Sequence, residues 1–158
     1  MTNLARTAAA LLVAASTSLG AAQTLAGAAD ETAVSDVLMA YEEALNAGDV
    51  PGIMRLYAAD GVFMPQPSPS QVGADAVQAA YEGVFSAISL DVAFDVVEIV
   101  LTAPDWAFAR TNSVGTVTVQ ANGAELSEAN QELFILHKQP NGAWKIARYA
   151  FSTTNPPR

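Results

Sequence analysis

The stretch from Trp106 to Ser152, WAFARTNSVGTVTVQANGAELSEANQELFILHKQPNGAWKIARYAFS, decides the fold of this chain. It contains three strand-like segments, rich in β-branched and aromatic residues, joined at the hairpin-type turns Asn122-Gly123 and Asn141-Gly142. A further strand-like segment, Val92–Leu101, precedes them and ends before the turn Pro104-Asp105. We therefore predict four antiparallel strands at 92–101, 106–120, 125–138 and 144–152.

Helical patterns occupy the sequence before these strands. The spacing of Val34, Leu38, Tyr41 and Leu45 predicts an amphipathic helix over about 32–47, and Gly48 and Asp49 are suited to its end and to the N-cap of a second helix. A short strand at 62–64 and a third helix over about 74–88 follow. Helices grouped before a sheet indicate an α+β fold rather than alternating βαβ units. Strands of 12–15 residues must curl around the helices, which leaves a cavity at the open end.

The N-terminus has the layout of a secretory signal peptide. Arg6 supplies a positive charge, the apolar run Ala8–Ala15 follows it, and small residues suitable for cleavage stand at 20–22 and 26–28. We therefore expect a signal peptide over 1–29 and a single domain over 30–158. The alternatives are a disordered Ala-rich tail and an uncleaved anchor, although the apolar run is too short to span a bilayer.

Composition narrows the class of protein. The chain has 158 residues, 51% of them hydrophobic, with 16 acidic against 7 basic side chains and a net charge of −9. Such acidity argues against binding nucleic acid or, after signal cleavage, an anionic membrane. The absence of cysteine excludes disulfides, thiolate catalysis and Cys-ligated zinc. We expect a secreted or periplasmic protein.

Two segments resemble a known superfamily. YEEALNAGDVPGIMRLYAADGVFMP (41–65) and ELFILHKQPNGAWKIARYAF (132–151) resemble nuclear transport factor 2-like domains, including SnoaL-like polyketide cyclases and ketosteroid isomerases, and the second resembles the SgcJ/EcaC-type branch. The resemblance implies a cone in which three N-terminal helices pack inside a strongly curved antiparallel sheet. It also implies a cavity for small molecules, while the superfamily includes enzymes, non-catalytic binders and association domains.

Comparison with ketosteroid isomerases implies a tyrosine cluster, but the two acids of their mechanism are missing from this sequence. Tyr41 matches the position of the oxyanion donor, and Tyr57 and Tyr81 match supporting positions. The alternative is that each tyrosine is an amphipathic core residue. The general base of that family, an aspartate before a proline, corresponds to Met64, and its second acid corresponds to the neighbourhood of Phe134. Because a thioether and a phenyl ring cannot replace these carboxyl groups, we do not expect isomerisation by that mechanism.

Strand alternation selects the remaining polar candidates. If Phe134 faces the cavity, then Asn130 and Glu132 face it too, and burial would poise the Glu132 carboxyl for acid–base chemistry. Arg110 and Arg148 are possible partners, each on a face that a single β-bulge would reverse. The bland alternative is a Glu–Arg pair on the outer surface.

The predicted site consists of Glu132 and Tyr41 as catalytic residues within a pocket. The other residues expected to line the pocket are Tyr57, Met64, Tyr81, Asn130, Phe134, Arg148, Tyr149 and Phe151. The proline-containing loop over 65–70 is either a connector or a rim above this pocket. His137 is expected outside the cavity, and no metal or cofactor is expected, since nothing in the sequence has ligand spacing or a nucleotide-binding fingerprint.

Three functions follow from these features. The first is a pocket protein for a small, largely apolar molecule, with acid–base activity. The second is a non-catalytic binder that uses the same cavity. The third is an association module, because exposed aromatic residues on the sheet would favour a homodimer.

Overall fold

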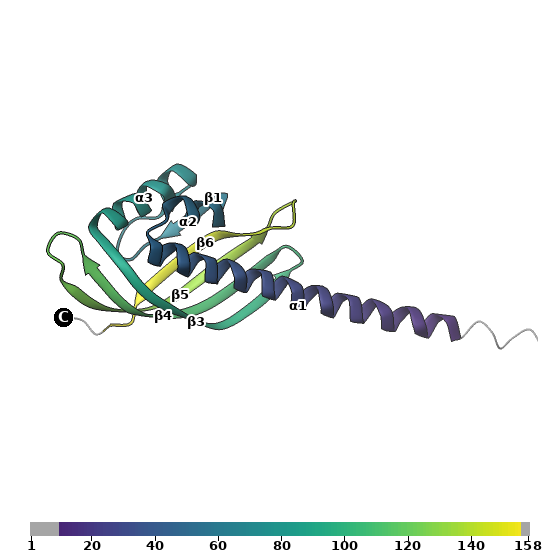
Figure 1. Ribbon diagram of the computed structural model, residues 1–158. Coiled ribbons are helices and arrows are strands. Elements are labelled where there is room, and N and C mark those ends of the chain that lie inside the picture. The colour runs from purple at the N-terminus through teal and green to yellow at the C-terminus, as the bar shows by residue number, and fades with distance from the viewer. Residues whose placement is uncertain (1–9, 156–158) are drawn as a thin grey trace, which may run out of the picture.

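The protein is a six-stranded curved sheet that encloses helices on its concave side (Figure 1). The computed structural model describes residues 10–155, and their side chains from Ala26 onward. The helices are α1 (Ala10–Ala47), α2 (Val50–Leu56) and α3 (Ala74–Ala87). The strands are β1 (Tyr57–Met64), β2 (Gln71–Val72), β3 (Ile88–Ala103), β4 (Trp106–Val119), β5 (Glu125–Lys138) and β6 (Trp144–Thr153).

The strand order is β2-β1-β6-β5-β4-β3, so the four C-terminal strands form the antiparallel meander expected from the turns. The α+β cone fold is therefore confirmed. One pairing differs from a purely antiparallel sheet, because β1 lies parallel to β6. The two-residue strand β2, which pairs with β1, was not expected, since its segment has too few residues to show a period.

The ends of the elements follow the local signals. Gly48 has a φ of 63°, a left-handed conformation that ends α1, and the Asp49 side chain accepts a hydrogen bond from the backbone N–H of Gly52 at 2.9 Å. The start of α1 at Ala10 differs from the expected start near Thr32, because the Ala-rich sequence before it has high helix propensity. Tyr57 begins β1 directly after α2.

Helix α1 is fastened along the free edge of β3. Asn46 pairs with both backbone groups of Val92: its Nδ2 donates to the carbonyl oxygen at 2.8 Å, and its Oδ1 accepts from the N–H at 2.9 Å. One turn earlier, Glu42 accepts from the N–H of Phe94 at 2.7 Å. These side chains satisfy backbone groups that no neighbouring strand covers, which closes one edge of the sheet.

The sheet bends where β3 and β4 approach each other at Gly115. A Cβ atom at this position would lie 2.0 Å from the carbonyl oxygen of Asp91 and 2.7 Å from the Cα of Val92. Only glycine permits such an approach, which is typical of a tight bend in a strand. The concave face that results holds a core of helix and sheet residues: Val34, Leu38, Tyr41, Ile53, Val77, Tyr81, Phe134, Leu136 and Ile146.

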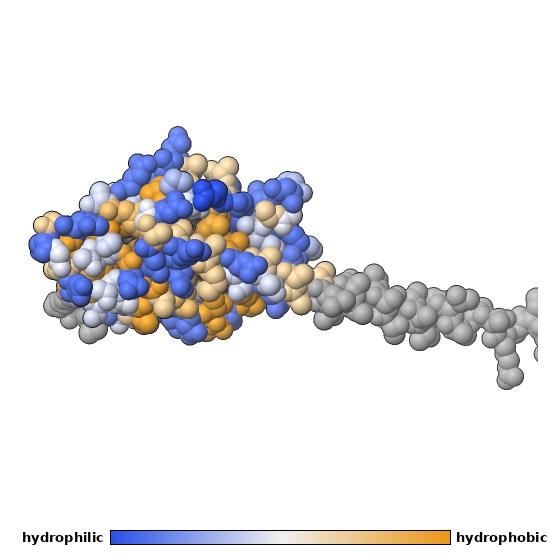
Figure 2. Space-filling model, in the orientation of Figure 1, coloured by the Kyte–Doolittle hydropathy of each residue, from blue (hydrophilic) through white to orange (hydrophobic). Residues whose placement is uncertain are grey.

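The described residues include only part of the predicted signal peptide. Arg6 and the beginning of the apolar run lie outside the described residues. Among the residues that the structure describes, no helix is both long enough and apolar enough to cross a membrane. The outer surface in view carries mainly hydrophilic residues interrupted by apolar ones (Figure 2).

Replacing Gly115 should destabilise the fold. We expect Gly115→Ala to lower the free energy of unfolding by about 2–4 kcal/mol, because the new methyl group overlaps the β3 backbone. The measurement is urea unfolding followed by circular dichroism. Gly83→Ala is the matched control: nothing lies within 4 Å of its Cβ position in α3, so this change should stabilise by about 0.5–1 kcal/mol. Equal stability of the two variants would contradict a tight approach at Gly115.

Candidate functional site: an aromatic cavity with a buried carboxyl group

A cavity of about 1390 Å³ lies between the helices and the concave face of the sheet. Its walls come from α1, α3 and strands β1 and β3–β6, and the loop after β1 contributes Pro65, Gln66 and Ser68. The loop over 65–70 is therefore part of the rim, the second of the two roles considered for it. Most of the remaining wall is apolar: Leu45, Phe63, Ala76, Ala80, Val84, Ile88, Leu90, Val92, Phe94, Val117 and Phe151.

The four tyrosines of the chain, Tyr41, Tyr57, Tyr81 and Tyr149, form one buried cluster. The Tyr81 hydroxyl lies 2.5 Å from that of Tyr41 and 3.0 Å from that of Tyr57, so the three phenols satisfy one another. Tyr149 packs against Tyr41 with ring centroids 5.3 Å apart. The convergent cluster predicted from the sequence is thus present, although Tyr57 lies behind the cavity wall rather than in it.

Parallel rings extend this cluster along the wall. Phe63 stacks on Tyr81 at 4.8 Å and on Tyr149 at 5.6 Å, and Tyr149 stacks on Phe134 at 4.3 Å. These residues come from four different elements, α3, β1, β5 and β6. The stack therefore fixes α3 against the sheet and gives the cavity a rigid aromatic side.

Burial raises the pKa of each of the four phenols well above its ordinary value of 10. Removal from water disfavours the charged phenolate, and the neighbouring phenols add to the effect. All four tyrosines are therefore neutral hydrogen-bonding groups at any physiological pH. None of them is a base.

Glu132 on β5 is the more buried of the two carboxyl-bearing side chains in the cavity wall, with 6% of its surface exposed. Ser113 donates to its Oε1 at 2.8 Å, and Thr111 donates to its Oε2. Burial raises the pKa of the Glu132 carboxyl above its ordinary value of 4.5, while hydrogen bonds from Thr111, Ser113 and Tyr149 act in the opposite direction. The carboxyl group is thus held in place, and its pKa is shifted toward neutrality, as acid–base chemistry requires.

Glu132 belongs to a row of polar side chains on the inner face of β5, which we term the polar strip. Asn130 continues this strip toward the mouth of the cavity. Its Nδ2 donates to Glu128 at 2.9 Å and lies 3.5 Å from the Ser113 hydroxyl. Its Oδ1 has no hydrogen-bond partner in the protein, although the side chain is about nine-tenths buried. A buried acceptor without a partner is costly, which makes this atom a natural contact for a bound molecule.

The structure places the predicted site residues in three groups. Six of them line the cavity: Tyr41, Tyr81, Asn130, Glu132, Tyr149 and Phe151. Tyr57 and Phe134 are buried in the core behind the wall. Met64 and Arg148 do not line the cavity, contrary to expectation; on β1 the alternation brings Phe63 to the inner face in place of Met64.

Arg148 is on the outer side because its neighbour Tyr149, which pairs with Phe134, faces the cavity. The register shift lies on the other side of Arg148: Ile135 pairs with Arg148 and Leu136 with Ile146, so Ala147 is an extra residue in β6. Because of this bulge, Tyr149 and Ile146 both face inward. The Arg148 Nη1 donates to the backbone carbonyls of Asp60 and Ala147. Arg110 also faces outward, where it pairs with Glu98. This is a Glu–Arg pair on the outer surface, the alternative considered for this residue.

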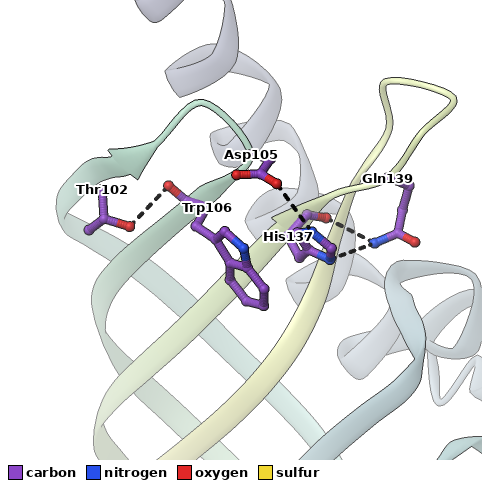
Figure 3. Close-up of polar contacts among 5 residues, drawn as sticks. All are labelled: Thr102, Asp105, Trp106, His137 and Gln139. Carbon is purple, nitrogen blue, oxygen red and sulfur yellow. Dashed lines mark hydrogen bonds and ion pairs between the residues drawn. The ribbon is translucent and has the colours of Figure 1, made fainter.

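His137 lies outside the cavity, where alternation predicted it. Its ring stacks on Trp106 at 4.2 Å, and its Nε2 is 3.6 Å from Asp105 (Figure 3). The Gln139 side chain contacts the other ring nitrogen. Within the described part of the chain, no group of three His, Cys, Asp or Glu side chains could hold a metal ion.

Sequence reasoning missed Thr111, Ser113 and Phe63. The register pairs Thr111 with Glu132 and Ser113 with Asn130, so both hydroxyls face the polar strip from the adjacent strand. Their i, i+2 spacing was the available signal, because two small polar residues alternate with outward-facing ones. It could be used only once the inner face of β4 was known.

Comparisons with known proteins agree with this architecture. The model of the SnoaL-like domain family matches residues 38–145. A solved ketosteroid isomerase-like protein from Erwinia carotovora atroseptica SCRI1043 is 37% identical, with a TM-score of 0.78, over 80% of this chain and 98% of that chain. The chain belongs to the SnoaL-like domain family.

Other members of this fold are more distant. A conserved protein from Planctomyces limnophilus DSM 3776 is 26% identical, with a TM-score of 0.70, over 79% of this chain and 98% of that one. A nuclear transport factor 2-like superfamily protein from Salmonella enterica serovar Typhimurium LT2 is 15% identical, with a TM-score of 0.73, over 82% and 94%, and shows the fold alone. A search among proteins of curated function finds no match. The SgcJ/EcaC branch stays a prediction.

The tyrosine cluster should be visible in a spectrophotometric titration. Because the folded pKa of every phenol is raised, we expect no phenolate absorbance in the native protein near pH 10, where the unfolded chain in guanidinium titrates. The neutral cluster stabilises the fold fully below the unfolded pKa, and this stability is lost as pH rises above it. Phenolate should therefore form together with unfolding. A native chain that ionises one or more tyrosines near pH 10 would contradict the buried cluster.

Proposed function

We propose that this SnoaL-like domain binds a small, largely apolar molecule in its cavity and moves a proton on that molecule through Glu132. The observation that carries the proposal is a buried carboxyl group at the wall of a large, mainly apolar and aromatic cavity. Apolar walls supply affinity by removing ligand surface from water, and a few polar groups orient the ligand. Proteins of this fold bind small ligands in the same cavity.

The local contacts suit Glu132 to proton transfer. Thr111 and Ser113 hold the carboxyl from the neighbouring strand, so it need not reorganise when its charge changes. A carboxyl whose pKa is raised toward neutrality retains a fraction of its acid form and is a stronger base than an exposed glutamate. In ketosteroid isomerases the acids stand at positions equivalent to Met64 and the neighbourhood of Phe134, so the present chemistry would differ in geometry.

We also propose that the domain acts outside the cytoplasm. The signal-like N-terminus and the acidic composition support export. A domain without disulfides in such a compartment depends on its packed core, and the interlocked aromatic stack between α3 and the sheet serves that purpose.

Glu132→Gln should abolish proton transfer while preserving the fold. The bound molecule is first identified by native mass spectrometry of protein purified from its own host. Deuterium exchange into that molecule in D2O is then followed by NMR, and we expect the variant to slow it by about 10²–10⁴-fold. Exchange should rise with pH through the raised pKa of Glu132, because the carboxylate is the base.

Glu125→Gln is the matched control, since Glu125 lies on the same strand, is exposed and does not line the cavity. It should leave the exchange rate unchanged. If wild type and Glu132→Gln exchange at the same rate, Glu132 is not the proton-transfer group. A cavity that is empty in protein from the host would count against binding itself.

A second function, homodimeric association, is supported by the outer face of the sheet. Four exposed hydrophobic side chains form what we term the outer-face patch: Val100, Trp106, Val114 and Leu133. The register places them on one face, because Val100 pairs with outward-facing Phe108 and Leu133 with Arg110. Exposed apolar area of this kind favours a partner, and a second copy offers a matching surface.

A charge in the outer-face patch should prevent this association. We expect wild-type protein to sediment as a dimer at concentrations above about 10 μM and Val114→Glu to sediment as a monomer, because the cross-strand neighbours Ala93 and Ala129 carry no charge and the interface would bury an unpaired carboxylate. Val72→Glu is the control, since Val72 is also exposed but lies on β2 at the opposite edge of the sheet. A wild-type chain that stays monomeric at several hundred micromolar would remove the dimer.

A further inference from the structure

The charged side chains that line the cavity are all acidic. Two carboxyl groups, Glu128 and Glu132, line it, and none of the lining residues within the described chain is lysine, arginine or histidine. The nearest arginines on the flanking strands, Arg110 and Arg148, both face outward. An anionic ligand would therefore lose its hydration and meet only negative charge, which excludes carboxylates and phosphates as the main ligands.

The polar strip on β5 is also dominated by acceptors. Glu128, Asn130 and Glu132 alternate along one face of the strand, at a spacing of about 6.6 Å between successive members. Asn130 stands between the two carboxyl groups, and its only donor group is already used by Glu128 and Ser113. Its Oδ1 is left without a partner. The group that completes this strip must therefore be a donor, and a positive charge would suit it best.

The remaining walls fit the apolar body of such a cation. Phe63, Tyr81, Tyr149 and Phe151 line the same cavity, and aromatic walls of this kind bury the carbon skeleton of a ligand. Together with the strip of acceptors they form an arrangement that accepts an organic ammonium group and the carbon skeleton attached to it. A neutral, purely apolar ligand would leave Asn130 unsatisfied.

We propose that the ligand of this cavity is a hydrophobic amine, bound as its ammonium form with the nitrogen at Asn130 between Glu128 and Glu132. This inference rests on the proposed function and names the class of its ligand. An ammonium group has three donors and no acceptor, so it complements the strip without leaving a lone pair opposed to a carboxylate. Its proton-bearing nitrogen also lies next to the group that is proposed to move a proton.

Binding of the ammonium form is coupled to the ionisation of Glu132. The cation favours the carboxylate, so the pKa of Glu132 falls in the complex, and protons are released when the amine binds near the pKa of the free protein. The affinity for the amine should rise as pH increases through that pKa. The affinity for a neutral analogue should stay constant or fall over the same pH range. This difference separates an ion pair from simple burial of apolar surface.

The test compares three probes of equal size, biphenylmethylamine, biphenylmethanol and biphenylcarboxylate, by isothermal titration calorimetry on the full chain at pH 7.5. Cavity occupation is checked independently by NMR shifts of the tyrosine and phenylalanine rings. We expect the amine to bind at least about tenfold more tightly than the alcohol, and the carboxylate more weakly than both. Calorimetry repeated over a pH series in two buffers of different ionisation enthalpy should show proton release for the amine alone, at the pH values where the Glu132 carboxyl of the free protein is partly protonated.

Substitutions on β5 test whether the preference for the amine comes from the two carboxyl groups. Glu132→Gln and Glu128→Gln should each lower the ratio of amine to alcohol affinity by about threefold or more, whereas Glu125→Gln on the same strand should leave that ratio unchanged. If the alcohol binds in the cavity as tightly as the amine, the inference is overturned while the apolar binding site stands. If none of the three probes shifts the cavity rings, both the inference and the proposed function are overturned.

Discussion

Gly115 on β4 lies directly against the backbone of Asp91 and Val92 on β3, and the shape of the molecule depends on this approach. A straight strand of the length of β3 would extend about 50 Å, far beyond the helices that it must cover. The pair β3–β4 can curl around the helices only if one residue at the bend lacks a side chain. The curl then encloses more volume than α1 and α3 fill, and the remainder is the cavity.

The curved sheet still has an open edge at β3, and α1 closes it with side chains. Asn46 imitates a neighbouring strand by bonding to both backbone groups of Val92, and Glu42 extends the pairing by one residue pair. Because Glu42 and Asn46 are one helical turn apart, the same turn presents Tyr41 and Leu45 to the cavity. The contact that protects the sheet edge therefore also places the helix tyrosine at the site.

The sequence determines the direction of a strand residue only as far as the register can be counted. Glu132 and Asn130 were placed correctly because no bulge separates them from Phe134 on β5. Arg148 was not, because its outward direction follows from the pairing of its neighbour Tyr149 with Phe134, which local sequence does not show. Helix caps and hairpin turns were predictable because their signals are local. The cluster of hydroxyls around Glu132 was not, since Thr111 and Ser113 come from a strand whose inner face depends on pairing across the sheet.

The phenols and the carboxyl group form one connected set, and this connection gives the site its sensitivity to a ligand. The phenols stay neutral because burial disfavours the phenolate, so the only group in the set that changes charge easily is Glu132. Its pKa reflects a balance in which burial outweighs three hydroxyl donors. A purely apolar ligand expels water and moves this balance further toward the acid form, whereas a cation moves it toward the carboxylate. The chemical nature of the bound molecule, rather than the protein alone, therefore determines whether the site presents an acid or a base.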